Sequence, residues 1–336
     1  MKFISIQILR GGAAWMVVFH HFFQIFFNHN TSNSIVNFLS YHFSIGVDIF
    51  FVISGFIMAY IVSTNTNLTF LSFIKNRLVR IVPNYWFYTF SFLFVGLFIK
   101  ELYVNNETVE TILMSLFFIS HLNPTLSLGY TPTLPVGWTL NFEIFFYFLV
   151  GLSLLFNFNN TKKLFFICVI LIMFVTIYKV FKIDFYNQIL AQVRLLEFVS
   201  GISLFLLREK YYKLFHSNFL IIFGCLMLYS VFTIDKLSIL IYVVISSFIV
   251  YMFLLFENMF SRNKNNFINI LVFQGKISYS LYLSHSMVLL VLFNIFHEFV
   301  YSYTLLIISM IIIYFISVTS YKYIEVKFAN YIKGKI

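Results

Sequence analysis

The chain has 336 residues, of which 61% are hydrophobic and only 10% are charged, and its mean hydropathy is +0.91. This balance excludes an ordinary soluble domain, in which about a quarter of the residues carry a charge. Apolar runs of about 20 residues, long enough to cross a bilayer as a helix, recur along the chain. The sequence therefore predicts an all-α polytopic membrane protein with one transmembrane domain over residues 1–336.

About ten spans are predicted by these runs, and a shorter apolar piece at 111–122 predicts a re-entrant or interfacial segment. No small-residue cleavage site follows the first run, so we expect no signal peptide. The expected spans are 5–27, 42–64, 82–100, 138–157, 164–182, 189–207, 217–234, 237–256, 277–297 and 302–321.

Lysine and arginine are distributed unequally over the loops between these spans. With the N-terminus inside, sixteen of them fall in cytoplasmic segments and four in outer segments. Because cytoplasmic loops of membrane proteins are enriched in Lys and Arg, we expect both termini in the cytoplasm. The net charge of +10 then reflects loops beside anionic lipid, and we expect no nucleic-acid partner.

No motif predicts a metal site. Cys168 and Cys225 fall in the middle of two different expected spans and lack metal-ligand spacing, so we expect buried free thiols. The longest loops are too short to hold an independent soluble core.

The first expected span carries ionisable residues that a lipid-facing helix would exclude. Arg10 and His21 are eleven residues apart, which places them within about 20° on one helix face and about 16 Å apart along the axis. His20 points about 100° away from that face. Ionisable groups inside a span are costly and by default indicate a functional site. A hydrogen-bonded packing role for His21 is the structural alternative.

Asp48 and Glu143 lie five or six residues below the outer edge of two other expected spans, at the depth of His21. We expect these three groups to converge on one polar chamber. An imidazole held by a carboxylate is the arrangement of a general base that acts on a hydroxyl. Asp48 can alternatively cap or pair, and Arg194 with Glu197 can form an i,i+3 pair that only joins helices.

Two arginines, Arg77 and Arg80, lie one helical turn apart before Pro83 in "FIKNRLVRIVPNYW". At this position the two guanidinium groups can bind a phosphorylated ligand bidentately. A positive-inside anchor is the alternative that the spacing alone favours. His285 in "GKISYSLYLSH" lies deep in an expected span, where it can line the same interior path.

Together these stretches resemble the acyltransferase 3 family, bacterial integral membrane O-acyltransferases of surface polysaccharides and related glycans. The resemblance runs in the family's order from about residue 6 to 327. Two features depart from the family pattern: no second Glu follows Glu143, and we expect the compact type without an appended SGNH-type domain. The matching segments are Arg10 with His21, "GVDIFFVISGF", "RLVRIVPNYW", "GWTLNFEIFFYF", "RLLEFVSGISLFLL" and "KISYSLYLSH".

The resemblance implies a multi-pass O-acyltransferase, in particular an O-acetyltransferase, of the bacterial inner membrane. Its donor would be cytoplasmic acetyl-CoA or another acyl-CoA, with no tightly bound cofactor. Its acceptor would be a hydroxyl of exopolysaccharide, capsule, O-antigen or a lipid-linked glycan. Membrane lipid would surround the protein. The expected residues are His21, Arg10, Glu143 and Asp48 for catalysis, and Arg77, Arg80, Trp138, Tyr85, His285, Arg194 and Glu197 for substrate binding.

In the mechanism that this resemblance implies, His21 deprotonates the sugar hydroxyl and Asp48 or Glu143 orients it for direct transfer. Arg10 steadies the thioester or its arm. A covalent acyl-histidine is the mechanistic alternative. Two other classes also fit the buried charges: a glycan or lipid-linked-oligosaccharide transporter, and a non-catalytic component of a polysaccharide assembly machine.

Overall fold

The computed structural model describes residues 3–65, 67–99, 106–123, 129–181, 193–210, 221–222, 239–262 and 265–335. Within these ranges the chain forms helices and connecting segments but no strand, as the composition predicts. Five helical stretches among the described residues are long and apolar enough to cross a membrane, while ten spans and cytoplasmic termini stay predictions. The five are Ser34–Thr64, Pro135–Ser153, Asn160–Ile177, Asn266–Phe296 and Ser302–Ile332.

The chain divides into two compact units, which are described separately. Unit 1 comprises Met1–Ala13, Ile45–Ile74 and Phe142–Gly275, and unit 2 comprises Ala14–Ser44, Lys75–Asn141 and Lys276–Ile336. The prediction of a single domain over 1–336 stays a prediction.

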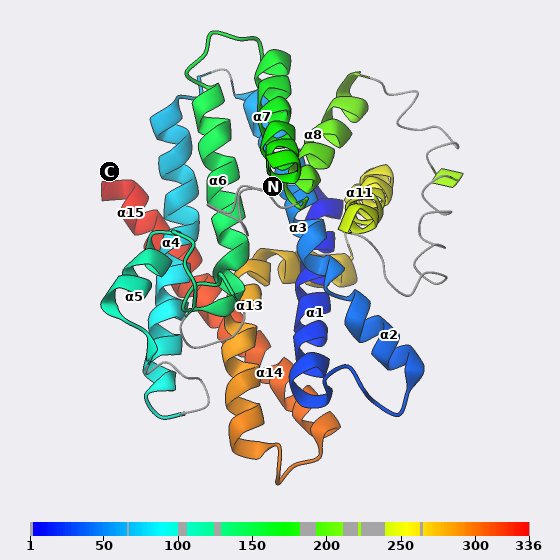
Figure 1. Ribbon diagram of the computed structural model, residues 1–336. Coiled ribbons are helices and arrows are strands. Elements are labelled where there is room, and N and C mark those ends of the chain that lie inside the picture. The colour runs from blue at the N-terminus through cyan, green and yellow to red at the C-terminus, as the bar shows by residue number, and fades with distance from the viewer. Residues whose placement is uncertain are drawn as a thin grey trace. The chain divides into compact units, whose positions relative to one another are not determined.

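Unit 1 is built around α3 (Ile45–Thr64), which packs against α7 (Asn160–Phe181), α8 (Leu195–Lys210) and α11 (Ile239–Leu255), as Figure 1 shows. The core between these helices is aromatic: the ring of Phe198 stacks on Phe146 at 4.3 Å and lies 5.0 Å from Phe51. The unit also holds the first residues of α1 (Ile4–Phe27), the start of α4 (Phe70–Gly96), most of α6 (Trp138–Ser153), α12 (Glu257–Arg262) and the start of α13 (Asn266–Phe296).

The first turn of α1, the helix that carries Arg10 and His21, is fixed by a carboxylate from α12. The backbone N–H groups of Ile4 and Ser5 each donate to Glu257 at 2.9 Å, and the Ser5 hydroxyl donates to the same carboxylate. A helix N-terminus leaves its first N–H groups without partners and carries partial positive charge, so a carboxylate stabilises it.

Glycines let α3 and α8 approach backbone to backbone. A Cβ added at Gly55 would lie 2.2 Å from the carbonyl oxygen of Phe198, and one at Gly201 would lie 2.1 Å from the carbonyl oxygen of Val52. Both distances are far inside van der Waals contact, and the obstacle is backbone, which no rotamer change removes. Small residues at such positions are how helices in a membrane pack closely.

We therefore expect Gly55→Ala and Gly201→Ala each to lower the free energy of unfolding by about 1–3 kcal/mol, because the added methyl group forces α3 and α8 apart. Gly12→Ala is the matched control, since no described atom lies within 4 Å of a Cβ there. Thermal unfolding of the purified variants in detergent measures the difference. A Gly201→Ala protein as stable as Gly12→Ala would contradict this packing.

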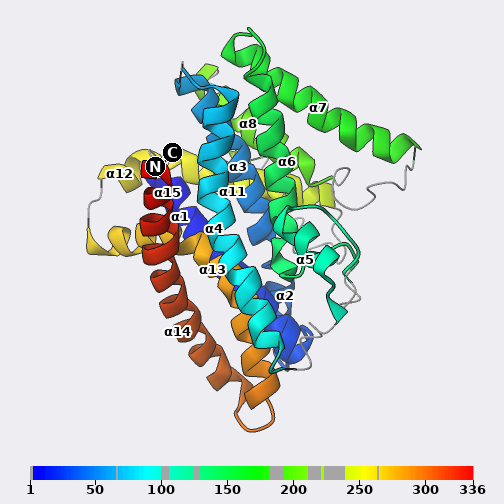
Figure 2. The same ribbon diagram turned by 90° about the vertical axis from the view of Figure 1, so that its left-hand side faces the viewer.

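Unit 2 contains most of α13 and all of α14 (Ser302–Ser320), which lie side by side, as both views show (Figures 1 and 2). Their serines face each other, with Ser284 Oγ 3.2 Å from Ser317 Oγ. The unit also holds the rest of α1, α2 (Ser34–His42), most of α4, α5 (Val109–Leu116), the 3-10 turn η3 (Pro135–Gly137), the start of α6, the π-helical η4 (Tyr321–Phe328) and α15 (Ala329–Lys335).

Several helix boundaries differ from those predicted. α4 begins at Phe70, not at 82, so Pro83 lies inside a helix and not at its start. α13 likewise begins at Asn266, not at 277. An apolar run predicts only the part of a helix that lies in lipid. The same helix can continue beyond the lipid through a turn that carries charged residues. The span predicted at 217–234 lies outside the described residues, apart from 221–222.

A helix that was not predicted from the sequence, α2, precedes α3. Its start is capped by Asn33, whose side-chain oxygen accepts from the backbone N–H groups of Ile35 and Val36. An Asn at the N-cap satisfies donors that would otherwise lack partners. This cap explains why a polar, Asn-rich stretch gives way to a helix here.

The short segment predicted at 111–122 overlaps the helix α5, which begins two residues earlier, at Val109. Thr108 caps its start, and the chain leaves it at Phe118, whose φ is 59°. The hydroxyl of Tyr85 donates to the carbonyl of Ser115 at 3.1 Å, and Trp86 Nε1 donates to that of Leu116 at 3.0 Å, which joins α5 to α4. A re-entrant or interfacial position for this segment stays a prediction.

Candidate functional site

His21, in the unit 2 part of α1, has one ring nitrogen engaged and the other available. Its Nδ1 lies 3.0 Å from the carbonyl oxygen of Val17 and 3.1 Å from Nε2 of His285. A carbonyl oxygen can only accept, so Nδ1 carries the hydrogen. In the neutral ring the lone pair is therefore on Nε2, the atom that a general base or a nucleophile uses.

His285, on α13, is fully buried beside His21. Its Nδ1 donates to the carbonyl of Tyr282 at 2.5 Å, so its Nε2 carries the lone pair and accepts from His21. The Tyr282 hydroxyl in turn donates to the Val136 carbonyl at 3.0 Å and accepts from Thr139 at 3.1 Å. These contacts fix the orientation of the His285 ring and, through it, the tautomer of His21.

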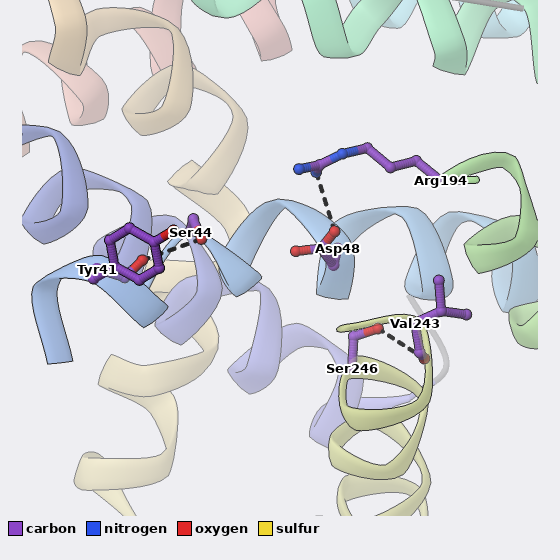
Figure 3. Close-up of polar contacts among 6 residues, drawn as sticks. All are labelled: Tyr41, Ser44, Asp48, Arg194, Val243 and Ser246. Atoms are coloured by element: carbon purple, nitrogen blue, oxygen red, sulfur yellow. Dashed lines mark hydrogen bonds and ion pairs between the residues drawn. The ribbon is translucent and has the colours of Figure 1, made fainter. Parts of the chain in front are cut away.

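Two carboxyl groups and one guanidinium are grouped in unit 1. Arg194, in the turn before α8, donates to Asp48 of α3 at 3.0 Å (Figure 3). Glu197 is fully buried and interacts electrostatically with both of these groups. The sequence suggests an i,i+3 pair of Arg194 with Glu197, and the structure adds a direct ion pair of Arg194 with Asp48, 146 residues away.

Glu143, on α6 in unit 1, accepts from two hydroxyl groups. Tyr147, one turn further along the helix, donates to its Oε1, and Ser54 of α3 donates to the same oxygen at 3.4 Å. Both hydroxyls orient the carboxylate. Glu143 and Asp48 belong to unit 1 and His21 to unit 2, so their convergence on one chamber stays a prediction.

The expected donor-binding arginines lie at different levels of burial. Arg10 lies on α1 with His21, as predicted, but within unit 1. In unit 2, Arg80 is exposed on α4 and Arg77 is partly buried. Trp138 begins α6 and is partly buried, and Tyr85 is fully buried with its ring 4.9 Å from that of Phe118. Substrate contact by these residues stays a prediction.

A polar network that was not predicted from the sequence joins α4, α13, α14 and η4. The amide of Asn84 donates to Ser280 at 3.0 Å and to Glu325 at 3.1 Å, and Ser320 donates to Asn84 at 2.7 Å. Ser280 also donates to Glu325. The sequence contains no signal for this network, because its members are up to 241 residues apart.

The family model described as "Acyltransferase domain" matches residues 3–321, which include every expected site residue. The chain belongs to the acyltransferase 3 family. This family member is 44% identical over 113 residues to the exopolysaccharide production protein ExoZ of Rhizobium meliloti (strain 1021). The matched part is 32% of this chain and spans 34%, about a third, of ExoZ. No solved structure matches the chain.

Family membership gives the imidazole pair a chemical context. Nucleophilic and general-base histidines in acyl transfer need one ring nitrogen free and the other oriented by a second group. His21 and His285 of this acyltransferase 3 family member have that relation. Among the described residues no group of three or more His, Cys, Asp or Glu side chains is placed to hold a metal ion.

Proposed function

We propose that this chain is a bacterial inner-membrane O-acyltransferase that transfers an acyl group, acetyl in particular, from acyl-CoA to a hydroxyl of a cell-surface or lipid-linked polysaccharide. The observation that carries the proposal is the state of His21: Nδ1 is engaged by Val17 and His285, and Nε2 is left to act on a hydroxyl. Family membership and the likeness to an exopolysaccharide production protein support the substrate classes.

In the proposed reaction His21 Nε2 removes the proton of the acceptor hydroxyl while the oxygen attacks the thioester carbonyl carbon. The new C–O bond forms, the C–S bond breaks, and the proton on Nε2 passes to the leaving sulfur, which gives an ester and CoA-SH. His285 Nε2 accepts from Nδ1 throughout and stabilises the transient imidazolium. An acyl-histidine formed at the same Nε2 is the mechanistic variant.

The residues of unit 1 are proposed to orient and stabilise. Arg10 would hold the thioester or its pantetheine arm, and Asp48 or Glu143 the acceptor. The ion pair of Asp48 with Arg194, and the hydroxyls on Glu143, keep these carboxylates in fixed positions. A carboxylate so fixed loses less freedom when it binds a substrate hydroxyl.

The donor is proposed to enter from the cytoplasm, where acyl-CoA is made. Arg77 and Arg80, one turn apart on α4, would bind its phosphates as charge-assisted partners. The inner-membrane location and cytoplasmic termini belong to this proposal, and the distribution of Lys and Arg supports them.

Replacing Arg77 and Arg80 with Gln is expected to raise the KM for acetyl-CoA about tenfold or more per residue and to change kcat little. Phosphate binding is largely the same in the ground and transition states, so its loss affects KM first. Steady-state kinetics with acetyl-CoA as the varied substrate measures the effect. Lys75→Gln, on the exposed part of the same helix, is the control. An unchanged KM would make these arginines topological anchors only.

Thioester consumption tests the proposed function itself. Detergent-solubilised protein with acetyl-CoA and surface glycan should release CoA thiol, which a thiol reagent measures. The mass of the glycan should rise by about 42 Da for each acetyl group that replaces a hydroxyl hydrogen. His21→Ala should do neither. A transporter or a non-catalytic component would leave acetyl-CoA intact, and that result would overturn the proposal.

A further inference from the structure

Two more imidazoles continue the row that begins with His285 and His21. The ring centroid of His20 lies 5.1 Å from that of His21, and the centroid of His29 lies 5.0 Å from that of His20. All four rings belong to unit 2. The proposed reaction uses only His285 and His21, so the other two need a separate account.

Ser40 of α2 sets the tautomers of both additional rings. Nδ1 of His20 donates to the Ser40 carbonyl at 2.8 Å. Nδ1 of His29 donates to the Ser40 hydroxyl at 3.2 Å, since that hydroxyl already donates to the carbonyl of Asn37. Both neutral rings therefore carry their lone pair on Nε2, like His21. The Nε2 atom of His29 has no hydrogen-bond partner among the described residues.

The backbone holds His29 in this place at a cost. Asn28 and His29 have φ values of 47° and 56°, a left-handed conformation that is uncommon outside glycine. It turns the chain at the end of α1, so that His29 lies against His20 and Ser40. Burial, and after it the neighbouring His20, lower the pKa of His29. His29 is thus neutral at pH 7 and able to accept.

The composition around this row favours an uncharged ligand rich in hydroxyl groups. Residues 14–44, which hold His20, His21 and His29, contain no Asp, Glu, Lys or Arg. An anionic ligand would be bound by Lys or Arg, whereas neighbouring imidazole acceptors suit successive hydroxyl donors. Tyr41 is 54% exposed, and its ring lies 5.9 Å from that of His29. An exposed aromatic ring beside polar acceptors provides the apolar face on which a sugar ring packs.

We propose that His20, His29 and Tyr41 form a subsite for a neutral sugar of the acceptor, next to the base His21. The proposal rests on the proposed function, because it assigns the acceptor side of the same site. His20 and His29 would accept hydroxyl hydrogens at Nε2, and Tyr41 would pack on the sugar ring. The chain would thereby hold one hydroxyl of that sugar within reach of His21.

The test uses variants that remove Nε2 and keep a donor in place of Nδ1. His20→Asn and His29→Asn keep an amide donor for Ser40, and Asn tolerates the left-handed backbone at position 29. The probes are methyl β-D-glucopyranoside, methyl β-D-galactopyranoside and methyl α-D-mannopyranoside with the full chain in nanodiscs. Saturation-transfer NMR should show binding to the wild type, and each variant should weaken it about three- to tenfold. His297→Asn, an exposed histidine outside the row, should bind as the wild type does.

With the same glycosides as acceptors, the variants should raise the acceptor KM by the same factor and leave the KM for acetyl-CoA within about twofold. Equal binding by His20→Asn, His29→Asn and wild type would overturn the subsite. So would the absence of binding by all three glycosides, or stronger binding of D-glucuronate than of any of them. Loss of binding in the variants without any acyl transfer by the wild type would support the subsite and overturn the proposed function.

Discussion

His21→Ala is expected to reduce kcat for acyl transfer at least about a hundredfold while expression, membrane insertion and thermal stability stay near those of the wild type. In the neutral His21 ring, Val17 and His285 engage Nδ1, so the lone pair of the proposed base is on Nε2. Alanine removes that base and is compatible with a helix. Release of CoA thiol at saturating acetyl-CoA and acceptor measures the change.

His20→Ala is the matched control for this experiment, because the two histidines are adjacent on α1 and both partly buried. At saturating acceptor it should lower kcat much less than His21→Ala does. His285→Ala should lie between them, about tenfold below wild type, because it removes the acceptor that orients His21 and not the base itself. Equal losses in His20→Ala and His21→Ala would contradict the assignment of His21 as the base.

Arg194→Gln is expected to destabilise unit 1 by about 3–5 kcal/mol, the cost of leaving buried charge without its partner. Asp48 and Glu197 are both buried, and Arg194 is the cation that interacts with both. Asp48→Asn should cost less, because Arg194 then still has Glu197. A larger loss of stability in Arg194→Gln than in Asp48→Asn would therefore indicate that Arg194 interacts with both Asp48 and Glu197, and not with Asp48 alone.

Thermal unfolding of the purified protein compares these variants. Lys210→Gln is the control: this lysine ends α8, the helix that Arg194 precedes, is exposed, and donates to Thr161. It should leave stability unchanged within a few tenths of a kcal/mol. An Arg194→Gln protein no less stable than Lys210→Gln would show that the buried carboxylates do not depend on Arg194.

The local features of the site were predictable from the sequence. The apolar run from residue 5 to 27 predicts α1 to within a residue at its start, and the spacing of Arg10 and His21 within it is a helical one. The run 138–157 likewise predicts the start of α6 at Trp138, and with it the place of Glu143. These features depend only on residues close together in the chain.

The partners of these residues were not predictable, because they come from distant segments. His285 reaches His21 across 264 residues, and Glu325 reaches Asn84 across 241. Helical periodicity pairs only residues three or four apart, so the sequence suggested Glu197 as a partner of Arg194 but could not indicate the ion pair with Asp48. Depth estimates could suggest that side chains share a level in the membrane, but not which of them touch.

His29 shows a second limit of sequence reasoning. It follows the end of α1 in an Asn-rich stretch that is typical of a polar connection, yet two residues with positive φ turn its ring onto His20 and Ser40. Positive φ outside glycine follows from the tertiary surroundings and not from residue type alone. The contacts from which the acceptor subsite is proposed are therefore found only in the structure.

The most direct test of the account supplies donor and acceptor from opposite sides of a membrane. Acetyl-CoA carrying a labelled acetyl group is enclosed in sealed proteoliposomes that contain the protein, and acceptor glycan is added outside. Label should appear in the outer glycan with the wild type and not with His21→Ala or with protein-free vesicles. Two results would contradict the account. One is label in the glycan only when donor and acceptor share one compartment, and the other is equal labelling by the wild type and His21→Ala.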